Sequence, residues 1–462
     1  MLGHQPAKRS ITATAVTVVG NLLPLWGVWF GDLAVGSLLV IYWIEGVATV
    51  LFATVKALLA RQGSPDVTRI EPLSELREKR GGVSLRPGWP PVYPRNVPFA
   101  LSVLGLWTAT VVPLAAAYWF VVAPPVRLTP VLALGIAGLL GAQSREFLFD
   151  FLGDSEYTDT SAREILLEPT QIALLMAILG FVGVANERLG GPLVLSALVL
   201  VKTGATLYRL FAAHPALPLP DRLAGRFTDE DLAEPAPEID SPTGEPRSSI
   251  AVASSPVLLA ALPTVAVGFL HRGVLAVFAL LGLATLVGGP VWLVPCLAVV
   301  LGIAAARIGS YYLRYGTIEY RRYEACLVAH DTLLDAPQWV VPVGGATFSV
   351  RNAATDRLLG TGTLDIQRLG SNDGSVQLGP VPDLDAAVET LDLPVVETDR
   401  PERDTAVTVA ALSLALSLLV VPAGLAVSPA ISGVELTGLA VVVGPLFMIP
   451  VGILVWVALR WS

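Results

Sequence analysis

Long apolar runs separated by short polar breaks make up most of the chain. The first two runs, 11–30 and 33–60, are joined by Gly31-Asp32 alone. A helix needs about 20 apolar residues to cross a membrane, and both runs meet that length. Each close pair of such runs therefore predicts a helical hairpin. The further runs lie at 97–123, 130–152, 170–185, 192–212, 406–427 and 434–459.

One more apolar block, 250–310, is broken at 271–273 and again at 288–290, which allows two or three helices. Basic residues gather at the cytoplasmic ends of membrane helices. The arginines around the end of this block favour two crossings, and they are Arg307, Arg314, Arg321 and Arg322. Taken together, the runs predict a polytopic α-helical membrane protein with about ten transmembrane helices. It would lie in the cell membrane with both termini cytoplasmic.

Residues 317–398 follow a different pattern. Apolar and polar residues alternate there in short runs, which predicts antiparallel strands: TIEYRRYEACLVAH, QWVVPV, ATFSVR, GTLDIQRL and SVQLGPV. Residues 371–374 signal a hairpin turn. Pro382-Asp383 then opens a short helix that ends near Leu391. This region is predicted to be one small cytoplasmic β domain.

These patterns divide the chain into five regions. Prolines and acidic residues replace the apolar periodicity at 213–249, which predicts a disordered linker. The five are a six-helix membrane domain at 1–212, the linker at 213–249, two membrane helices at 250–316, the β domain at 317–398 and a C-terminal transmembrane hairpin at 399–462.

Composition agrees with a membrane protein. Hydrophobic residues make up 53% of the chain and charged residues 15%, and the mean hydropathy is +0.66. The net charge of −8 argues against a nucleic-acid partner, because phosphate contact needs a basic face. Cys296, Cys326 and four scattered histidines show no metal-ligand spacing. We therefore expect no metal and no cofactor.

Glu45 is the most unusual residue of the apolar runs, because it stands in the middle of 33–60. A charge at the bilayer centre costs about 2.5 to 3.5 kcal/mol, so we expect it to have a partner. Lys202 lies at a matching depth in its own run, and Asn21 reaches a similar level, with Tyr42 beside the carboxylate. Two interpretations stay open: an ion pair that fixes helix packing, and a polar site for a proton, an ion or a substrate.

A second polar group, Arg145, Glu146 and Asp150, is predicted near the cytoplasmic side, at the start of the polar segment 143–171. It fits either the mouth of a cavity or a solvated loop with local ion pairs. The sequence offers no set of residues for nucleophilic or metal-assisted catalysis. The chain is therefore interpreted as a non-enzyme, although this stays open.

The N-terminal half resembles a known family. The strings that carry the resemblance are YWIE from Tyr42, SREFLFDFLGDSEYTDTSAREILLEPTQ from Ser144 and LVLVKTGATLYRL from Leu198. Over residues 11–212 the chain resembles the multi-pass family called domain of unknown function 6498, which is common in haloarchaea. Members usually have Asn where this chain has Gly46. The resemblance implies a topology and no activity.

The C-terminal half resembles a second family. Its strings TIEYRRYEACLVAHDTLLDAPQWVVPV and TFSVRNAATDRLLGTGTLDIQ are similar to the bacterial pleckstrin-homology-like family, over residues 251–398. The resemblance implies two membrane helices that lead into a curved antiparallel sheet, closed by a helix at 383–391. Eukaryotic namesakes bind phosphoinositides at a basic mouth. Residues 320–398 instead contain five arginines and no lysine against eleven acidic residues, which favours a protein partner.

Two functions follow from these patterns. The first is a non-enzymatic scaffold or sensor, embedded in the lipid bilayer, whose region 317–398 binds protein partners. The alternative is a transporter or an ion- or proton-coupled membrane protein that uses the Glu45–Lys202 pair.

Overall fold

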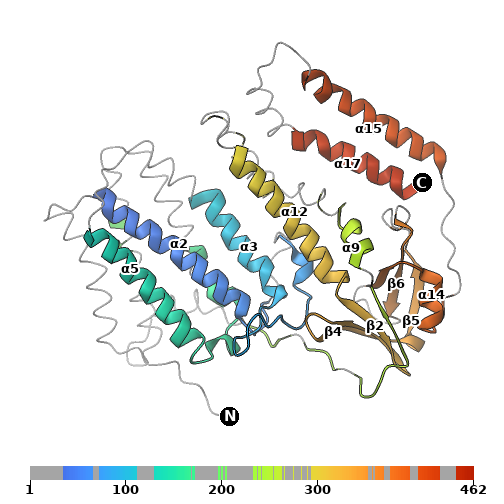
Figure 1. The fold of residues 1–462 in the computed structure, drawn as a ribbon, viewed down its shortest axis with the longest axis horizontal. Coiled ribbons are helices and arrows are strands. Elements are labelled where there is room, and N and C mark those ends of the chain that lie inside the picture. Colours follow the sequence, from blue (N-terminus) through green and yellow to red (C-terminus); the bar gives the residue numbers. More distant parts are fainter. Residues whose placement is uncertain are drawn as a thin grey trace, which may run out of the picture. The chain divides into compact units, whose positions relative to one another are not determined.

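The computed structural model describes helices and strands in two compact units (Figure 1). The described residues are 35–65, 72–111, 130–171 except 168, 233–252 except 237 and 241, 254–262, 293–351, 359–368, 375–395, 404–426 and 444–461, with a few isolated positions between them. Unit 1 comprises Met1–Glu71 and Ser84–Ala236, and unit 2 comprises Pro72–Val83 and Pro237–Ser462. A short stretch of the N-terminal half thus belongs to the C-terminal unit.

The described part of unit 1 contains three α-helices of ten or more residues. They are α2 (Val35–Leu59), α3 (Val97–Leu106) and α5 (Pro130–Arg145), and α2 packs against both of the others. Wider π-helical turns continue α3 at Trp107–Val111 and α5 at Glu146–Phe151. Each helix begins within two residues of the predicted start of its apolar run, so the helices predicted there are confirmed.

The C-terminal end of α2 is capped from the far side of a loop. The last carbonyl groups of a helix have no partner within the helix, so a buried helix end needs outside donors. The fully buried amide of Asn96 donates to the carbonyl oxygens of Ala57 and Ala60, at 2.8 Å each. The guanidinium of Arg95 donates to the next carbonyl, that of Arg61.

Replacing Asn96 with alanine should therefore destabilise the end of α2 by about 1 to 3 kcal/mol, because two buried carbonyls each lose a donor and that of Ala57 keeps only the Ala60 N–H, at 3.3 Å. Hydrogen exchange of the amides in the last two turns of α2 would measure this. Ser102→Ala is the matched control, since that hydroxyl bonds only within its own helix, to the Pro98 carbonyl. Equal protection in both variants would contradict the capping role.

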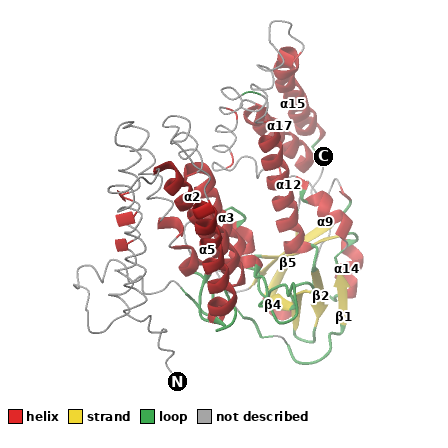
Figure 2. Ribbon diagram, turned by 60° about the vertical axis from the view of Figure 1, so that its left-hand side comes forward, coloured by secondary structure: helices red, strands yellow, loops and turns green. Residues whose placement is uncertain are grey.

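Unit 2 contains two antiparallel sheets. The first has the order β1 (Ser248–Ala251), β2 (Ile318–Arg322), β3 (Cys326–Asp331) and β4 (Ala336–Pro342). The second has the order β5 (Ala346–Val350), β6 (Gly362–Arg368) and β7 (Val376–Val381). Figure 2 shows these strands together, with the helix α14 (Leu384–Thr390) beside them. We call β1 and residues 317–395 the β domain.

Four further helices of unit 2 pack in two pairs. The short helix α9 (Ser254–Ala260) packs against α12 (Leu293–Tyr315), and α15 (Thr405–Ala426) packs against α17 (Gly444–Trp461). Only Gly316 and Thr317 separate α12 from β2, so the sheet continues directly from this helix (Figure 1).

The core of the β domain draws on both sheets and on α14. Alternate residues of β2 are buried, as the period of two predicts. The fully buried residues of this core include Tyr320, Leu327, Leu364, Leu378 and Leu391. Each of the five runs predicted in 317–398 contains a strand, and the first run is divided into two strands, β2 and β3. The helix predicted after Pro382 is confirmed. Asp383 caps that helix, because its carboxylate accepts from the Ala386 N–H at 3.0 Å.

The buried hydroxyl of Tyr320 joins the two sheets, because it accepts from the Gly379 N–H at 2.9 Å. Tyr320→Phe should cost about 1 to 3 kcal/mol, since that N–H then stays buried without an acceptor. Burial also raises the pKa of Tyr320 above its ordinary value of 10.0. The phenol therefore contributes stability below pH 10 that is lost as the pH rises further, because the unfolded chain gives up this proton first.

Urea denaturation at pH 8 and pH 11 would measure both effects. We expect Tyr320→Phe to lower the free energy of unfolding at pH 8. The variant should also lose less of that free energy than the wild type between pH 8 and pH 11. Tyr323→Phe, at a half-buried position of the next turn, is the control. A variant that keeps the full alkaline loss would contradict this role of Tyr320.

The predicted fold class is wrong. Instead of a polytopic α-helical membrane protein of about ten transmembrane helices, the described residues form a mixed α/β architecture with two antiparallel sheets. Within them one helical stretch, Leu297–Tyr315, is long and apolar enough to cross a membrane, and none of it is fully buried. The multi-pass topology is accordingly not supported. Hydropathy alone counted every apolar run as a crossing, although α2 buries Val50 and Ala57 against protein.

Candidate functional site

The predicted midplane cluster lies only partly in the described residues. Asn21 and Lys202 lie outside them, and so does the side chain of Tyr42. Glu45 lies in α2 and is half-buried. The Glu45–Lys202 pair therefore stays a prediction.

The second predicted cluster lies where α5 passes into its π-helical turn. Arg145 and Asp150 are exposed, whereas Glu146 accepts a hydrogen bond from the ammonium of Lys56 on α2, at 2.8 Å. The same ammonium lies 5.5 Å from the centre of the Phe151 ring. Because the Glu146 side chain is 44% exposed, this ion pair is a surface contact between two helices, worth at most about 1 kcal/mol.

A more deeply buried set of polar contacts surrounds residues Pro72–Val83, which we call the docking segment. Its one helical element is the 3-10 turn η1 (Ser74–Leu76), which lies beside α12. Leu73, just before this turn, and Leu76, its last residue, are buried. The chain before and after the docking segment belongs to unit 1, so the segment reaches unit 2 as an excursion of the N-terminal half.

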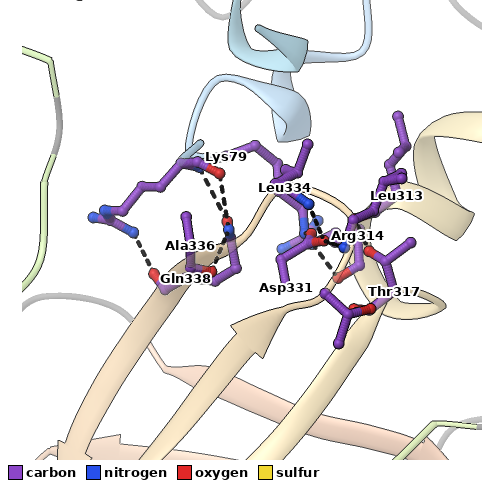
Figure 3. A network of polar contacts seen from close by, with 11 residues as sticks. Lys79, Leu313, Arg314, Thr317, Asp331, Leu334, Ala336 and Gln338 are labelled. Carbon is purple, nitrogen blue, oxygen red and sulfur yellow. Dashed lines mark hydrogen bonds and ion pairs between the residues drawn. The ribbon is translucent and has the colours of Figure 1, made fainter. Parts of the chain in front are cut away.

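Lys79 of the docking segment forms a buried ion pair with Asp331, at the end of β3 (Figure 3). The ammonium lies 2.8 Å from Oδ2, and the two side chains are 5% and 0% exposed. The ammonium also lies 3.4 Å from the carbonyl oxygen of Arg314, in the last turn of α12. A cation is favoured at a helix C-terminus, where the carbonyl groups point outward.

The other oxygen of Asp331 is held by its own strand end. Oδ1 accepts from the N–H groups of Leu333 and Leu334, at 3.0 and 3.1 Å. The following Thr332 bonds through its N–H and its hydroxyl to the Thr317 carbonyl, at the junction of α12 and β2. The carboxylate is thus positioned without help from Lys79, and Oδ2 is left for the ammonium.

Gln338 of β4 contacts the main chain of the docking segment (Figure 3). Its amide accepts from the Arg80 N–H at 3.1 Å and donates to the Arg80 carbonyl at 3.0 Å. The Arg80 guanidinium donates in turn to the Gln338 carbonyl. Gly81 follows at φ +81°, where a Cβ would lie 2.5 Å from the Leu334 carbonyl oxygen. This position therefore requires glycine.

Burial lowers the pKa of Lys79 below its ordinary value of 10.5, and the neighbouring Asp331 opposes that shift. The arrangement binds the ammonium of Lys79 and the main-chain N–H and C=O of Arg80. Within the described ranges, no group of His, Cys, Asp or Glu side chains is placed to hold a metal ion.

Sequence reasoning missed Lys79, Asp331 and Gln338. The signal that was available is modest: Lys79 is one of four lysines in the chain, and Gly81-Gly82 follow it almost at once. The seven basic residues of 61–96 indicate only a cytoplasmic loop by the positive-inside rule, and they hide Lys79 among other charges.

The fold and this site define a mixed α/β protein in which a segment of the N-terminal half is bound by a C-terminal β domain. Residues 4–221 match the model of a family described as a family of unknown function, DUF6498, so the resemblance predicted for residues 11–212 is confirmed. No curated protein and no solved structure matches the chain. The comparisons do not support the pleckstrin-homology-like resemblance of residues 251–398. Lys79 lies inside the matched range, and Asp331 lies beyond it.

Proposed function

We propose that the protein is a non-enzymatic, membrane-attached adaptor whose β domain binds a protein partner at the membrane face. The observation that carries this proposal is the direct continuation of α12 into β2. Because Gly316 and Thr317 are the whole connection, a β domain behind a membrane-crossing α12 would stay within a few residues of the lipid surface.

The composition of α12 supports this placement. Leu297 and Leu301 are each 59% exposed, as expected of side chains that face lipid. Arg307 and Arg314 follow toward the end of the helix, where basic residues suit the membrane–water interface. Tyr311, Tyr312 and Tyr315 pack against the core of the β domain and join it to the helix.

The charge of the β domain supports a protein partner. Five arginines against eleven acidic residues in 320–398 give a net charge of −6, and a negative surface is repelled by anionic head groups. Vesicle binding by the purified protein should therefore not increase with the content of phosphatidylserine. An increase would contradict the choice of a protein partner.

Replacing Leu301 with arginine tests the membrane attachment. Arginine within a membrane helix costs about 2.5 to 3.5 kcal/mol, which corresponds to a loss of about 100-fold in partition to the membrane. Carbonate-washed membranes should retain the wild type and Leu85→Arg, a control at a position that is 77% exposed and outside α12. If Leu301→Arg is retained as fully as the control, α12 is not the anchor.

A further inference from the structure

We infer that Arg314, Asp331 and Gln338 form a peptide-binding site, filled in this structure by the chain's own docking segment, and that the partner of the β domain is a peptide with the pattern Leu-x-x-Lys-x-Gly. The inference rests on the proposed function, because it names the partner class of the same domain. The pattern is that of Leu76, Lys79 and Gly81.

The site is organised independently of its occupant. Asp331 is held by the N–H groups of its own turn, and that turn is tied to Thr317. Gln338 also donates to the Ala336 carbonyl, at 3.2 Å within its own strand. The groups that meet the docking segment therefore do not depend on it for their positions, and such preorganisation lowers the cost of binding.

Each contact selects a different property of the bound peptide. The carboxylate of Asp331 and the carbonyl of Arg314 select an ammonium at one position. The amide of Gln338 pairs with a backbone N–H and C=O, which any residue offers. The close approach of Leu334 and Ala336 admits only glycine two residues after the lysine. The apolar anchor is Leu76, which is 2% exposed.

The docking segment competes with any partner because it belongs to the same chain. An intramolecular ligand acts at an effective concentration that the length and stiffness of its connection set, so it competes with a partner from solution. A partner peptide should therefore bind weakly to the wild type and strongly once the docking segment is disabled. The contact thus keeps the β domain closed to partners until the N-terminal half withdraws it.

The experiment uses the full chain and a labelled peptide, PLSELREKRGGV, which is the sequence of residues 72–83. In one variant a Gly-Ser stretch of equal length replaces residues 72–83, and in a second Lys79→Met weakens the internal contact. Fluorescence anisotropy should show at least about 30-fold tighter binding to both variants than to the wild type. Removing one member of a buried charge pair has an effect of that size.

Two controls establish the specificity. A peptide with methionine in place of its lysine should lose binding to the Gly-Ser variant, and Asp331→Asn in that variant should abolish binding of the original peptide. Bound peptide should also raise the melting temperature of the Gly-Ser variant, which reports a folded site. If the Gly-Ser variant has a cooperative melting transition and does not bind the peptide, the segment is a fixed structural contact and the inference fails.

The outcome separates this inference from the proposed function. Peptide binding by a protein that leaves washed membranes would keep the site and refute the membrane attachment. Retention of the wild type in the membrane, together with a Gly-Ser variant that does not bind the peptide, would support the membrane attachment and refute the peptide-binding site.

Discussion

Replacing Lys79 with methionine is expected to destabilise the β domain by about 3 to 5 kcal/mol, the largest effect of any single substitution considered for this chain. The reason is that Asp331, with a side chain that is 0% exposed, would keep its charge in the interior without an ammonium beside it. Hydrogen exchange of the β3 and β4 amides would measure the loss, because it reports local opening free energies.

The chain offers a matched control for this substitution. Lys56 makes an ion pair of the same length, 2.8 Å, but its partner Glu146 is 44% exposed. Lys56→Met should therefore change the stability of its own region by less than about 1 kcal/mol. The double variant Lys79→Met with Asp331→Asn should regain part of the loss, since the remaining side chain is uncharged. Similar effects at Lys79 and Lys56 would show that burial does not set the strength of the pair.

Gly81→Ala is expected to produce the second largest effect, about 2 to 5 kcal/mol. A left-handed conformation costs about 1 to 2 kcal/mol for a residue with a Cβ. Here the Cβ would also lie 2.5 Å from the Leu334 carbonyl oxygen and 2.7 Å from the Ala336 Cβ, and overpacking adds about 1 to 3 kcal/mol. The docking segment must then move away from β4.

Gly88 separates the two contributions, because it has the same φ of +81° and nothing within 4 Å of its Cβ position. Gly88→Ala should show only the conformational cost. Limited proteolysis within residues 72–83 should become faster in Gly81→Ala and stay at the wild-type rate in Gly88→Ala. Equal rates would mean that the close approach at Gly81 relaxes without releasing the segment.

The local elements of the β domain could be predicted from the sequence, because each depends on neighbouring residues. The alternation in 318–342 gives β2, β3 and β4 directly, and Asp383 gives the start of α14. β1 was not predicted, since its four residues, SSIA, follow a proline-rich stretch and carry little pattern of their own. Its partner β2 begins about 70 residues later, across α9 and α12.

The buried ion pair could not be predicted for a related reason. Lys79 and Asp331 are 252 positions apart, and each resembles an ordinary surface charge in its own neighbourhood. Glu45 is conspicuous in the sequence because its neighbours are apolar, whereas Lys79 stands among other charges. Hydropathy also misled the count of membrane helices, because an apolar run predicts a helix without specifying whether protein or lipid covers it.

The route of the chain through Pro72–Val83 has a practical consequence for dissecting the molecule. A fragment that starts in the proline-rich stretch would contain both sheets and lack the lysine that neutralises Asp331. Such a fragment would be made with its peptide-binding site empty, and the apolar surface that Leu76 covers should make it tend to associate. Fusing the missing dozen residues to the fragment through a flexible linker should keep it in solution. The chain therefore cannot be divided between its two halves into fragments that are each complete.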